Sequence, residues 1–269
     1  MAETPQTTPE QRKPYIDDKS PDKIVSPKSM HRLQLAGDAI AATKRAIAHQ
    51  GNQVPALAAT NMNSKYRLMA MRDPRAWDYT PEAQALASQH KEADVAAKAD
   101  LAHGGNCGEH AWVAFHYLRQ HGSGEPINRI KPSYIDHAFV IIGDLKADKD
   151  NEMAVSDPWT NKPVACLWED HFSHGPREEL TSQATMVADG NSYKSAIAAG
   201  LKLSAYGEQL VKKADSEKDT KEQTDNWEAN HYWLQDDTRA EGSEFHYKTN
   251  QPQQGHQDAE HSSSRAARE

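Results

Sequence analysis

Residues 104–159 decide the fold of this chain, and they contain three short motifs: GGNCGEHA at 104–111, IDHAFVII at 135–142 and AVSDPW at 154–159. Each motif places one reactive side chain at the end of a predicted element. Cys107 opens a helix, His137 opens an apolar strand, and Asp157 follows the next strand. A thiol nucleophile needs a base, and that base needs a third group to orient it. The stretch therefore predicts a cysteine nucleophile with a histidine base and an orienting aspartate.

The setting of Cys107 favours a reactive thiolate over an inert thiol. Gly104 and Gly105 break the preceding helix and allow a substrate to approach closely, and Asn106 is a typical N-cap residue. A helix N-terminus stabilises a thiolate and offers free backbone N–H groups. We expect Asn106 and Gly105 to line the substrate or oxyanion site together with the Cys107 amide. The alternative is a buried, inert cysteine, which is the usual role of a free thiol.

The two other motifs predict an antiparallel pair of strands. The run over 137–142 and the run over 153–156 are joined by a charged turn, which is typical of such a pair. We expect His137 to lie beside Cys107, with Asp157 on the far side of the imidazole. Taken alone, His137 could be a structural histidine and Asp157 could start an ordinary turn. Trp159 could line the active site or simply pack in the core.

The rest of the chain predicts an α+β fold in which several helices precede this core. Residues 1–29 and 236–269 are polar and are predicted to be disordered, which leaves a single catalytic domain over 30–235 with its core at about 103–170. The aromatic side chains of 226–234 are expected to dock on this domain. The remaining predicted elements are helices over about 29–50, 54–71, 80–102, 107–122 and 192–211, and a third strand over 164–168.

Composition argues against several other classes of function. The net charge of −8 disfavours a general nucleic-acid binder, which carries a basic face. No stretch is apolar over the length of a membrane-spanning helix, and a cleaved secretory signal peptide is not expected from the polar N-terminus. The two cysteines, Cys107 and Cys166, do not make a disulfide framework. A reduced pair suits a cytosolic working compartment.

A zinc site is an alternative chemistry for the central segment. Four residues of metal-binding type lie close together: His103, Cys107, Glu109 and His110. Gly104 and Gly105 interrupt the helical face that these residues would share, and no second ligand pair has zinc-finger spacing. Three further polar residues are expected in a solvated loop: Asp170, His171 and His174. We therefore expect neither a metal nor a cofactor.

The motifs together resemble the transglutaminase-like branch of the papain-like superfamily. That branch shows a Gly-x-Cys element, an apolar helix, a His-Ala strand and an Asp-Pro strand end, which correspond here to 105–107, 107–118, 137–138 and 157–158. The resemblance implies that Cys107 is the nucleophile, His137 the general base and acid, and Asp157 the residue that orients the imidazole. The oxyanion glutamine of papain-like enzymes is replaced here by Leu101.

The segment looks particularly like the protease and glutamine-deamidase domains of bacterial toxins and injected effectors. This resemblance implies a thiol-dependent acyl-transfer enzyme acting on protein amides, most simply a secreted effector that deamidates glutamine in a host protein or cleaves it. Transglutamination with an amine acceptor, and a non-catalytic adaptor that retains the fold, stay open. We expect a monomer with a protein substrate and without nucleic-acid partners. It would be delivered into the host cytoplasm without a cleaved signal peptide, or otherwise be cytoplasmic.

Overall fold

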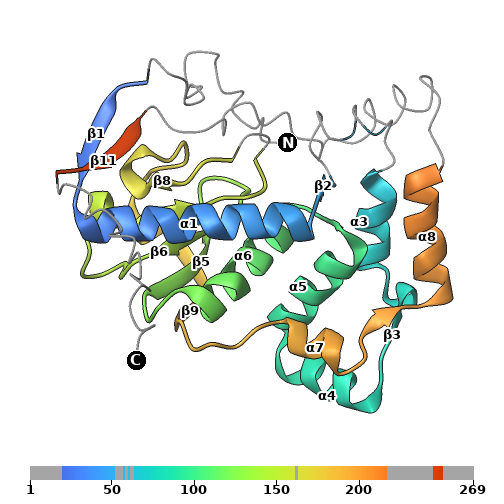
Figure 1. Ribbon diagram of the computed structural model, residues 1–269. Helices are drawn as coiled ribbons and strands as arrows, with labels where there is room; N and C mark the ends of the chain where they lie inside the picture. The colour runs from blue at the N-terminus through green and yellow to red at the C-terminus, as the bar shows by residue number, and fades with distance from the viewer. Residues whose placement is uncertain are drawn as a thin grey trace, which may run out of the picture.

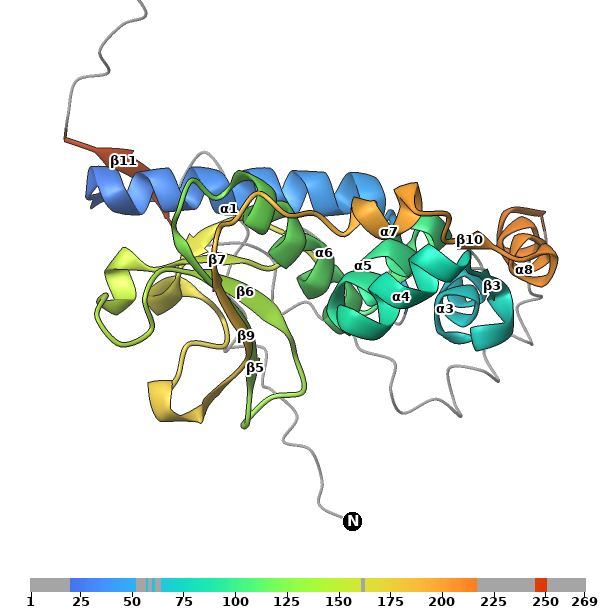
Figure 2. The ribbon, with the colours of Figure 1, turned by 90° about the horizontal axis from the view of Figure 1, so that it is seen from below.

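The computed structural model describes residues 20–51, 57, 60, 64–160, 163–216 and 245–250. It has an α+β architecture in which an antiparallel sheet and a group of helices lie side by side (Figures 1 and 2). The long helix α1 (Pro27–Ala46) lies across the sheet side and packs against α6 (Cys107–His121), which lies between the two parts. The α+β class predicted from the sequence is therefore correct.

Within the described residues the largest sheet has five strands in the order β8-β7-β6-β5-β9, all antiparallel to their neighbours. Its strands are β5 (Pro126–Pro132), β6 (Phe139–Ile142), β7 (Ala154–Ser156), β8 (Cys166–Leu167) and β9 (Leu180–Val187). The apolar run of β6 is buried on both faces, because Val140 and Ile142 pack beneath α1 and α6 whereas Phe139 and Ile141 face a second cluster. The predicted pairing of this run with 153–156 is found as β6–β7.

Helix α6 begins where the sequence predicts. Asn106 is its N-cap, Cys107 its first residue and Gly122 its C-cap. The apolar residues of α6 recur at helical spacing and pack on α1 and the sheet; they are Ala111, Ala114, Phe115 and Leu118. The Cys107 end of α6 is thereby fixed next to the sheet.

The helical part differs from the prediction because two predicted helices are divided. The helix expected over 80–102 breaks at His90, and the one expected over 192–211 breaks at Gly200, whose φ of +106° favours glycine. The helices here are α3 (Ser64–Arg72), α4 (Pro81–Gln89), α5 (Lys91–Ala102), α7 (Lys194–Ala198) and α8 (Ala205–Ser216). Most of the segment 54–63 lies outside the described residues, as does 226–234.

Short elements connect these parts. Strand β2 (His49–Gln50) pairs with β4 (Gly104–Gly105), and β3 (Trp77–Asp78) pairs with β10 (Lys202–Leu203). Single 3₁₀ turns are η2 (Pro74–Ala76), η3 (Asp150–Glu152), η4 (Trp168–Asp170) and η5 (Arg177–Glu179).

The structure also differs from the prediction near both ends of the chain. β1 (Asp22–Val25) and β11 (His246–Thr249) lie inside the regions predicted to be disordered, yet they form a parallel pair (Figure 1). Tertiary contacts explain the difference. The Tyr247 hydroxyl donates to Asp170 at 2.8 Å, and the Lys23 ammonium donates to the same carboxylate at 2.8 Å. These contacts join segments that are distant in sequence, so local composition does not reveal them.

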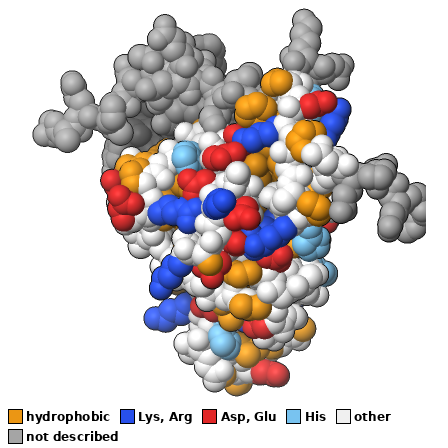
Figure 3. All heavy atoms as spheres, turned by 90° about the vertical axis from the view of Figure 1, so that its left-hand side faces the viewer, with side chains coloured by type: hydrophobic (Ala, Val, Ile, Leu, Met, Phe, Trp, Pro, Cys, Tyr) orange, Lys and Arg blue, Asp and Glu red, His pale blue; other side chains and the backbone are white. Residues whose placement is uncertain are grey.

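Charges of both signs are mixed over the face near β1 and β11 (Figure 3). Ion pairs join many of them, including Lys28 with Asp148, Lys248 with Asp22, and Lys23 with Glu169. This face therefore offers no broad surface of one sign. None of the described helices combines the length and apolar character needed to cross a membrane.

Candidate active site

The structure brings Cys107, His137 and Asp157 together. Nε2 of His137 lies 2.6 Å from Oδ2 of Asp157, and both side chains are buried. The Cys107 thiol interacts with the same imidazole from the start of α6. Nδ1 of His137 forms no hydrogen bond of ordinary geometry within the described part of the chain. Because an ionised carboxylate only accepts, Nε2 carries the hydrogen of the pair, and Nδ1 is the nitrogen left for the thiol.

Strand pairing explains how these residues meet. Val140 of β6 pairs with Ser156 of β7, so the start of β6 lies next to the end of β7. His137 occupies the turn just before β6 rather than the strand itself, because β6 begins at Phe139. Asp157 follows β7 directly. Two adjacent strand ends therefore hold His137 and Asp157, and α6 supplies the Cys107 thiol.

Burial and the neighbouring charge shift the pKa of His137 in opposite directions. Burial lowers the pKa of His137, but the charge and hydrogen bond of Asp157, with a further contribution from Cys107, raise that pKa well above its ordinary value. Burial raises the pKa of Asp157, but His137 and then His171 hold it below its usual range. The pair therefore favours an imidazolium next to a carboxylate.

Aromatic rings enclose the imidazole. The ring centroids of Trp159, Phe172 and Phe139 lie 5.2, 5.5 and 5.7 Å from that of His137. Trp159 is only 1% exposed, so it both lines the histidine and packs in the core. Such surroundings limit water around the ring and strengthen its interaction with Asp157.

A second histidine contacts Asp157 and was missed by the sequence prediction. Nε2 of His171 lies 3.3 Å from Oδ2 of Asp157, while its Nδ1 accepts from the Ser173 hydroxyl at 2.7 Å and from the Ser173 amide at 3.4 Å. Ser173 thus leaves Nε2 as the donor towards Asp157.

The prediction of a solvated loop is therefore wrong for two of its three residues. His171 and Asp170 are buried, whereas His174 is exposed and contacts Asp150 at 2.8 Å. No spacing in the sequence links position 171 to position 157, because the turn η4 brings them together.

The glycines before Cys107 have a packing role in the structure. A Cβ on Gly105 would lie 2.5 Å from Cβ of Glu109, and a Cβ on Gly104 would lie 2.7 Å from Cβ of Arg67. The Glu109 carboxylate accepts the Asn106 amide at 2.7 Å and thereby caps α6. Oδ1 of Asn106 lies 2.9 Å from where a Cβ of Gly51 would be.

These contacts bear on the expected oxyanion site. Oδ1 of Asn106 lies against Gly51 and, as an acceptor, cannot stabilise an oxyanion, so Nδ2 is the side-chain atom of Asn106 that could donate. The first turn of α6 still presents N–H groups without helical partners, and the backbone at Cys107 is among them. Main-chain groups are therefore available as donors at this position, beside the Nδ2 group of Asn106.

The four residues of the zinc alternative do not converge in the described part of the structure. Among the described residues, no three His, Cys, Asp or Glu side chains converge on a point that could hold a metal ion. Nδ1 of His103 donates to the Ala46 carbonyl, and Nδ1 of His110 donates to the Asn106 carbonyl. Glu109 is engaged by Arg72 at 3.0 Å. These side chains are directed to separate partners.

Lys44 approaches the site from α1. Its ammonium donates to the Thr160 carbonyl at 3.1 Å. Burial lowers the pKa of Lys44 to about 8, although the charge of Asp157 acts in the opposite direction. Burial, reinforced by Lys44, lowers the pKa of the enclosed His110 to about 3. His110 is therefore neutral at physiological pH, and Lys44 adds positive charge beside Asp157.

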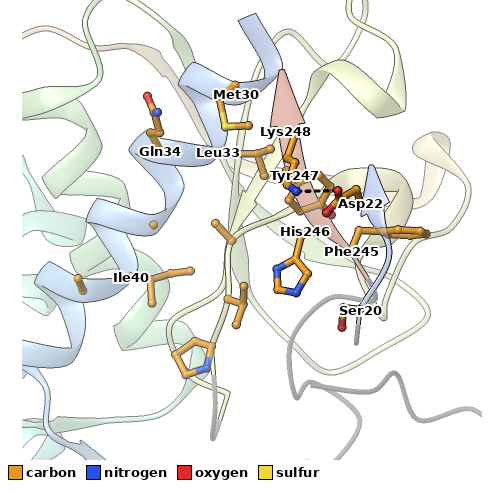
Figure 4. Close-up of a pocket in the computed structure, with 15 residues that line it drawn as sticks. Ser20, Asp22, Met30, Leu33, Gln34, Ile40, Phe245, His246, Tyr247 and Lys248 are labelled. Carbon is orange, nitrogen blue, oxygen red and sulfur yellow. Dashed lines mark hydrogen bonds and ion pairs between the residues drawn. The ribbon is translucent and has the colours of Figure 1, made fainter. Parts of the chain in front are cut away.

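A large cavity lies elsewhere in the molecule, between α1 and β11 (Figure 4). It has a volume of about 900 Å³, and apolar side chains such as Leu33 and Ile40 line it, with the Asp22–Lys248 ion pair at its side. The three residues of the candidate site do not line this cavity. Neither Cys107 nor Cys166 lines it, so the cavity is separate from the thiol of the candidate site.

Comparison with known proteins gives no relative: no family model matches the chain, no curated protein matches it, and no solved structure matches its fold. The resemblance of residues 104–159 to transglutaminase-like enzymes therefore rests on the motifs themselves.

Proposed function

We propose that this protein is a thiol-dependent acyl-transfer enzyme that hydrolyses amides in proteins. The observation that carries the proposal is the buried His137–Asp157 pair at 2.6 Å, with the second imidazole nitrogen left for the Cys107 thiol. A nucleophile, a base and a group that orients the base are the parts that covalent catalysis requires. The α+β arrangement of α6 on an antiparallel sheet supports a papain-like or transglutaminase-like core under the same proposal.

The first half of the reaction forms a thioester. The thiol proton moves to Nδ1 of His137, and the thiolate of Cys107 attacks the carbonyl carbon of the substrate amide, whose π electrons move to oxygen. The imidazolium then gives its proton to the amide nitrogen. The C–N bond breaks, and ammonia or an amine leaves.

The second half releases the product. Nδ1 of His137 takes a proton from water while the oxygen of that water attacks the thioester carbonyl. The C–S bond breaks, the acid product leaves, and sulfur recovers its electrons as a thiolate. Asp157 keeps the imidazole oriented in both halves, and His171 keeps Asp157 in place. The N–H groups at the start of α6 can stabilise the oxyanion.

The reaction catalysed depends on which amide is the substrate and which acceptor attacks the thioester. Deamidation of glutamine, peptide cleavage and transglutamination share the thioester and differ in the leaving group and the acceptor. The resemblance to toxin and effector domains favours deamidation or cleavage of a host protein by a secreted effector that acts in the host cytoplasm. A polar substrate segment would have to reach Cys107, which is partly exposed, unlike the buried Cys166.

Two measurements on the full chain test the proposal. In the first, iodoacetamide alkylation of Cys107 is followed by peptide mapping from pH 5 to 9, with N-acetylcysteine as the reference thiol. We expect Cys107 to react at pH 6 at least about tenfold faster than the reference, because a neighbouring imidazolium and a helix N-terminus both favour a thiolate. In the second, a eukaryotic lysate is incubated with the protein and with Cys107→Ala, and mass spectrometry distinguishes deamidated, cleaved and crosslinked products.

The outcomes separate the alternatives. Modification that requires Cys107 supports the enzyme, and its kind identifies the reaction. An ordinary thiol at position 107, together with identical lysates from both proteins, would contradict the proposal and favour the adaptor.

A further inference from the structure

Arg129 contacts Gly108, the residue after Cys107, although no sequence motif marks it as a candidate. It belongs to β5, two residues after Ile127, so both side chains face α6. The sheet register shifts between Arg129 and Ile130, and such a bulge redirects the adjacent side chain. The guanidinium lies at the first turns of α6, where it contacts Gly108 and Trp112.

The contacts of Arg129 hold its charge at the Cys107 end of α6. Nη2 donates to the Gly108 carbonyl at 3.3 Å, and the guanidinium carbon stacks over the Trp112 ring at 4.2 Å. The residue is only 6% exposed, yet its Nε has no hydrogen-bond partner in the described part of the chain. A carbonyl and an aromatic face do not neutralise a guanidinium, and no carboxylate of the described residues forms an ion pair with Arg129.

A negative charge on the Cys107 sulfur would give the Arg129 guanidinium an ionic partner. Burial lowers the pKa of Arg129 to about 10, and the charges of Cys107 and then Glu109 oppose that shift. Glu109 is already committed to the Asn106 amide and to Arg72. Of the two described residues whose charge acts on Arg129, Cys107 is therefore the one that could supply a negative charge not already paired.

We propose that Arg129 is a second cation of the active site, which together with His137 stabilises negative charge on the Cys107 sulfur. The inference rests on the proposed function, since it needs a thiolate at Cys107. The thiol proton goes to Nδ1 of His137, and the charge left on sulfur lies between the imidazolium and the guanidinium. Arg129 acts on the nucleophile and is not itself a proton donor, because a guanidinium does not titrate near neutral pH.

The test compares the pH dependence of Cys107 alkylation in variants of the full chain. Arg129→Met keeps the volume and removes the charge, and Arg129→Lys keeps the charge. Arg119→Met is the matched control, because Arg119 is a similarly buried arginine near the other end of α6, where it pairs with Asp189. His137, which interacts with Cys107, and Glu109, the other charge that acts on Arg129, are retained in all of these variants.

We expect Arg129→Met to move the midpoint of the alkylation profile to higher pH, so that the rate at pH 6 falls about tenfold. The plateau rate at high pH should be unchanged. Arg129→Lys should recover most of the rate at pH 6, and Arg119→Met should leave the profile unchanged. A merely structural role for Arg129 would alter the melting temperature or scale the rate at every pH without moving the midpoint.

Two failures are distinguishable. If wild-type Cys107 behaves as an ordinary thiol, the proposed function fails. If wild-type Cys107 is reactive and Arg129→Met leaves the midpoint where it was, the role of Arg129 is refuted while the enzyme stands.

Discussion

Replacing Asp157 by asparagine removes one charge from the candidate site while keeping nearly the same shape. Oδ2 of Asp157 lies 2.6 Å from Nε2 of His137 and 3.3 Å from Nε2 of His171. Asparagine can still accept one of these hydrogen bonds through its amide oxygen. What it cannot do is stabilise the imidazolium by charge, so the proton accepted from Cys107 is held less firmly.

The size of the expected effect follows from replacing a hydrogen bond to a charged group by one to a neutral group. A hydrogen bond to a charged group contributes about 1.5–3 kcal/mol, compared with about 1 kcal/mol for a neutral one. The net loss on the imidazolium state is therefore about 0.5–2 kcal/mol, which corresponds to a rate about 2- to 30-fold lower. We expect this fall in the alkylation rate of Cys107 at pH 6, where the reaction depends on proton transfer to His137.

Alkylation is measured by peptide mapping, as a second-order rate with iodoacetamide. Asp148→Asn is the matched control, because Asp148 is also a buried, ion-paired aspartate but binds Arg32 and Lys28 instead. It should lose stability without losing the reactivity of Cys107. If Asp157→Asn and Asp148→Asn alkylate equally fast at pH 6, Asp157 does not act on the thiol through His137 and our assignment of its role is wrong.

Two further predictions concern stability. Gly105→Ala should lower the free energy of unfolding by about 1–3 kcal/mol through overpacking, because the new Cβ would lie 2.5 Å from that of Glu109. Gly37→Ala is the control, since no atom lies within 4 Å of its new Cβ, and it should be neutral or stabilising in the same urea titration. Equal effects of the two substitutions would contradict the packing role of Gly105. The melting temperature of the wild type should exceed that of His137→Gln most at about pH 5. The raised pKa of His137 contributes stability below about pH 6.5 that is lost as pH rises, and the lowered pKa of Asp157 contributes stability above about pH 4 that is lost as pH falls. A difference in melting temperature that stays constant from pH 5 to 9 would contradict this linkage.

Local signals were sufficient to predict the elements that carry the candidate residues. Asn106 after two glycines is a strong helix start, and α6 begins there. The apolar run of β6 and its charged turn predicted the β6–β7 pair, which places His137 next to Asp157. These relations depend on residues close together in sequence, where capping and periodicity act.

Contacts between distant segments could not be predicted. β5 carries polar residues such as Asn128 and Arg129 at buried positions, so no alternation marks it as a strand. β9 is recognisable only once its partner β5 is in place. The pairing of β1 with β11 joins the two ends of the described chain. His171 reaches Asp157 for the same reason, since tertiary packing rather than spacing determines that contact.

The buried polar cluster at His137 is difficult to explain by stability alone. A buried ion pair gives little net stabilisation, since desolvation offsets much of its attraction, and apolar residues of similar volume often replace such a pair without loss. This core nevertheless encloses His137, Asp157 and His171 beneath aromatic rings. An adaptor that used only the outer helices would gain nothing from holding an imidazolium there. A nucleophile at Cys107 would gain from it, because His137, Asp157 and His171 would together make a thiolate easier to form. For this reason we favour catalysis over a vestigial site.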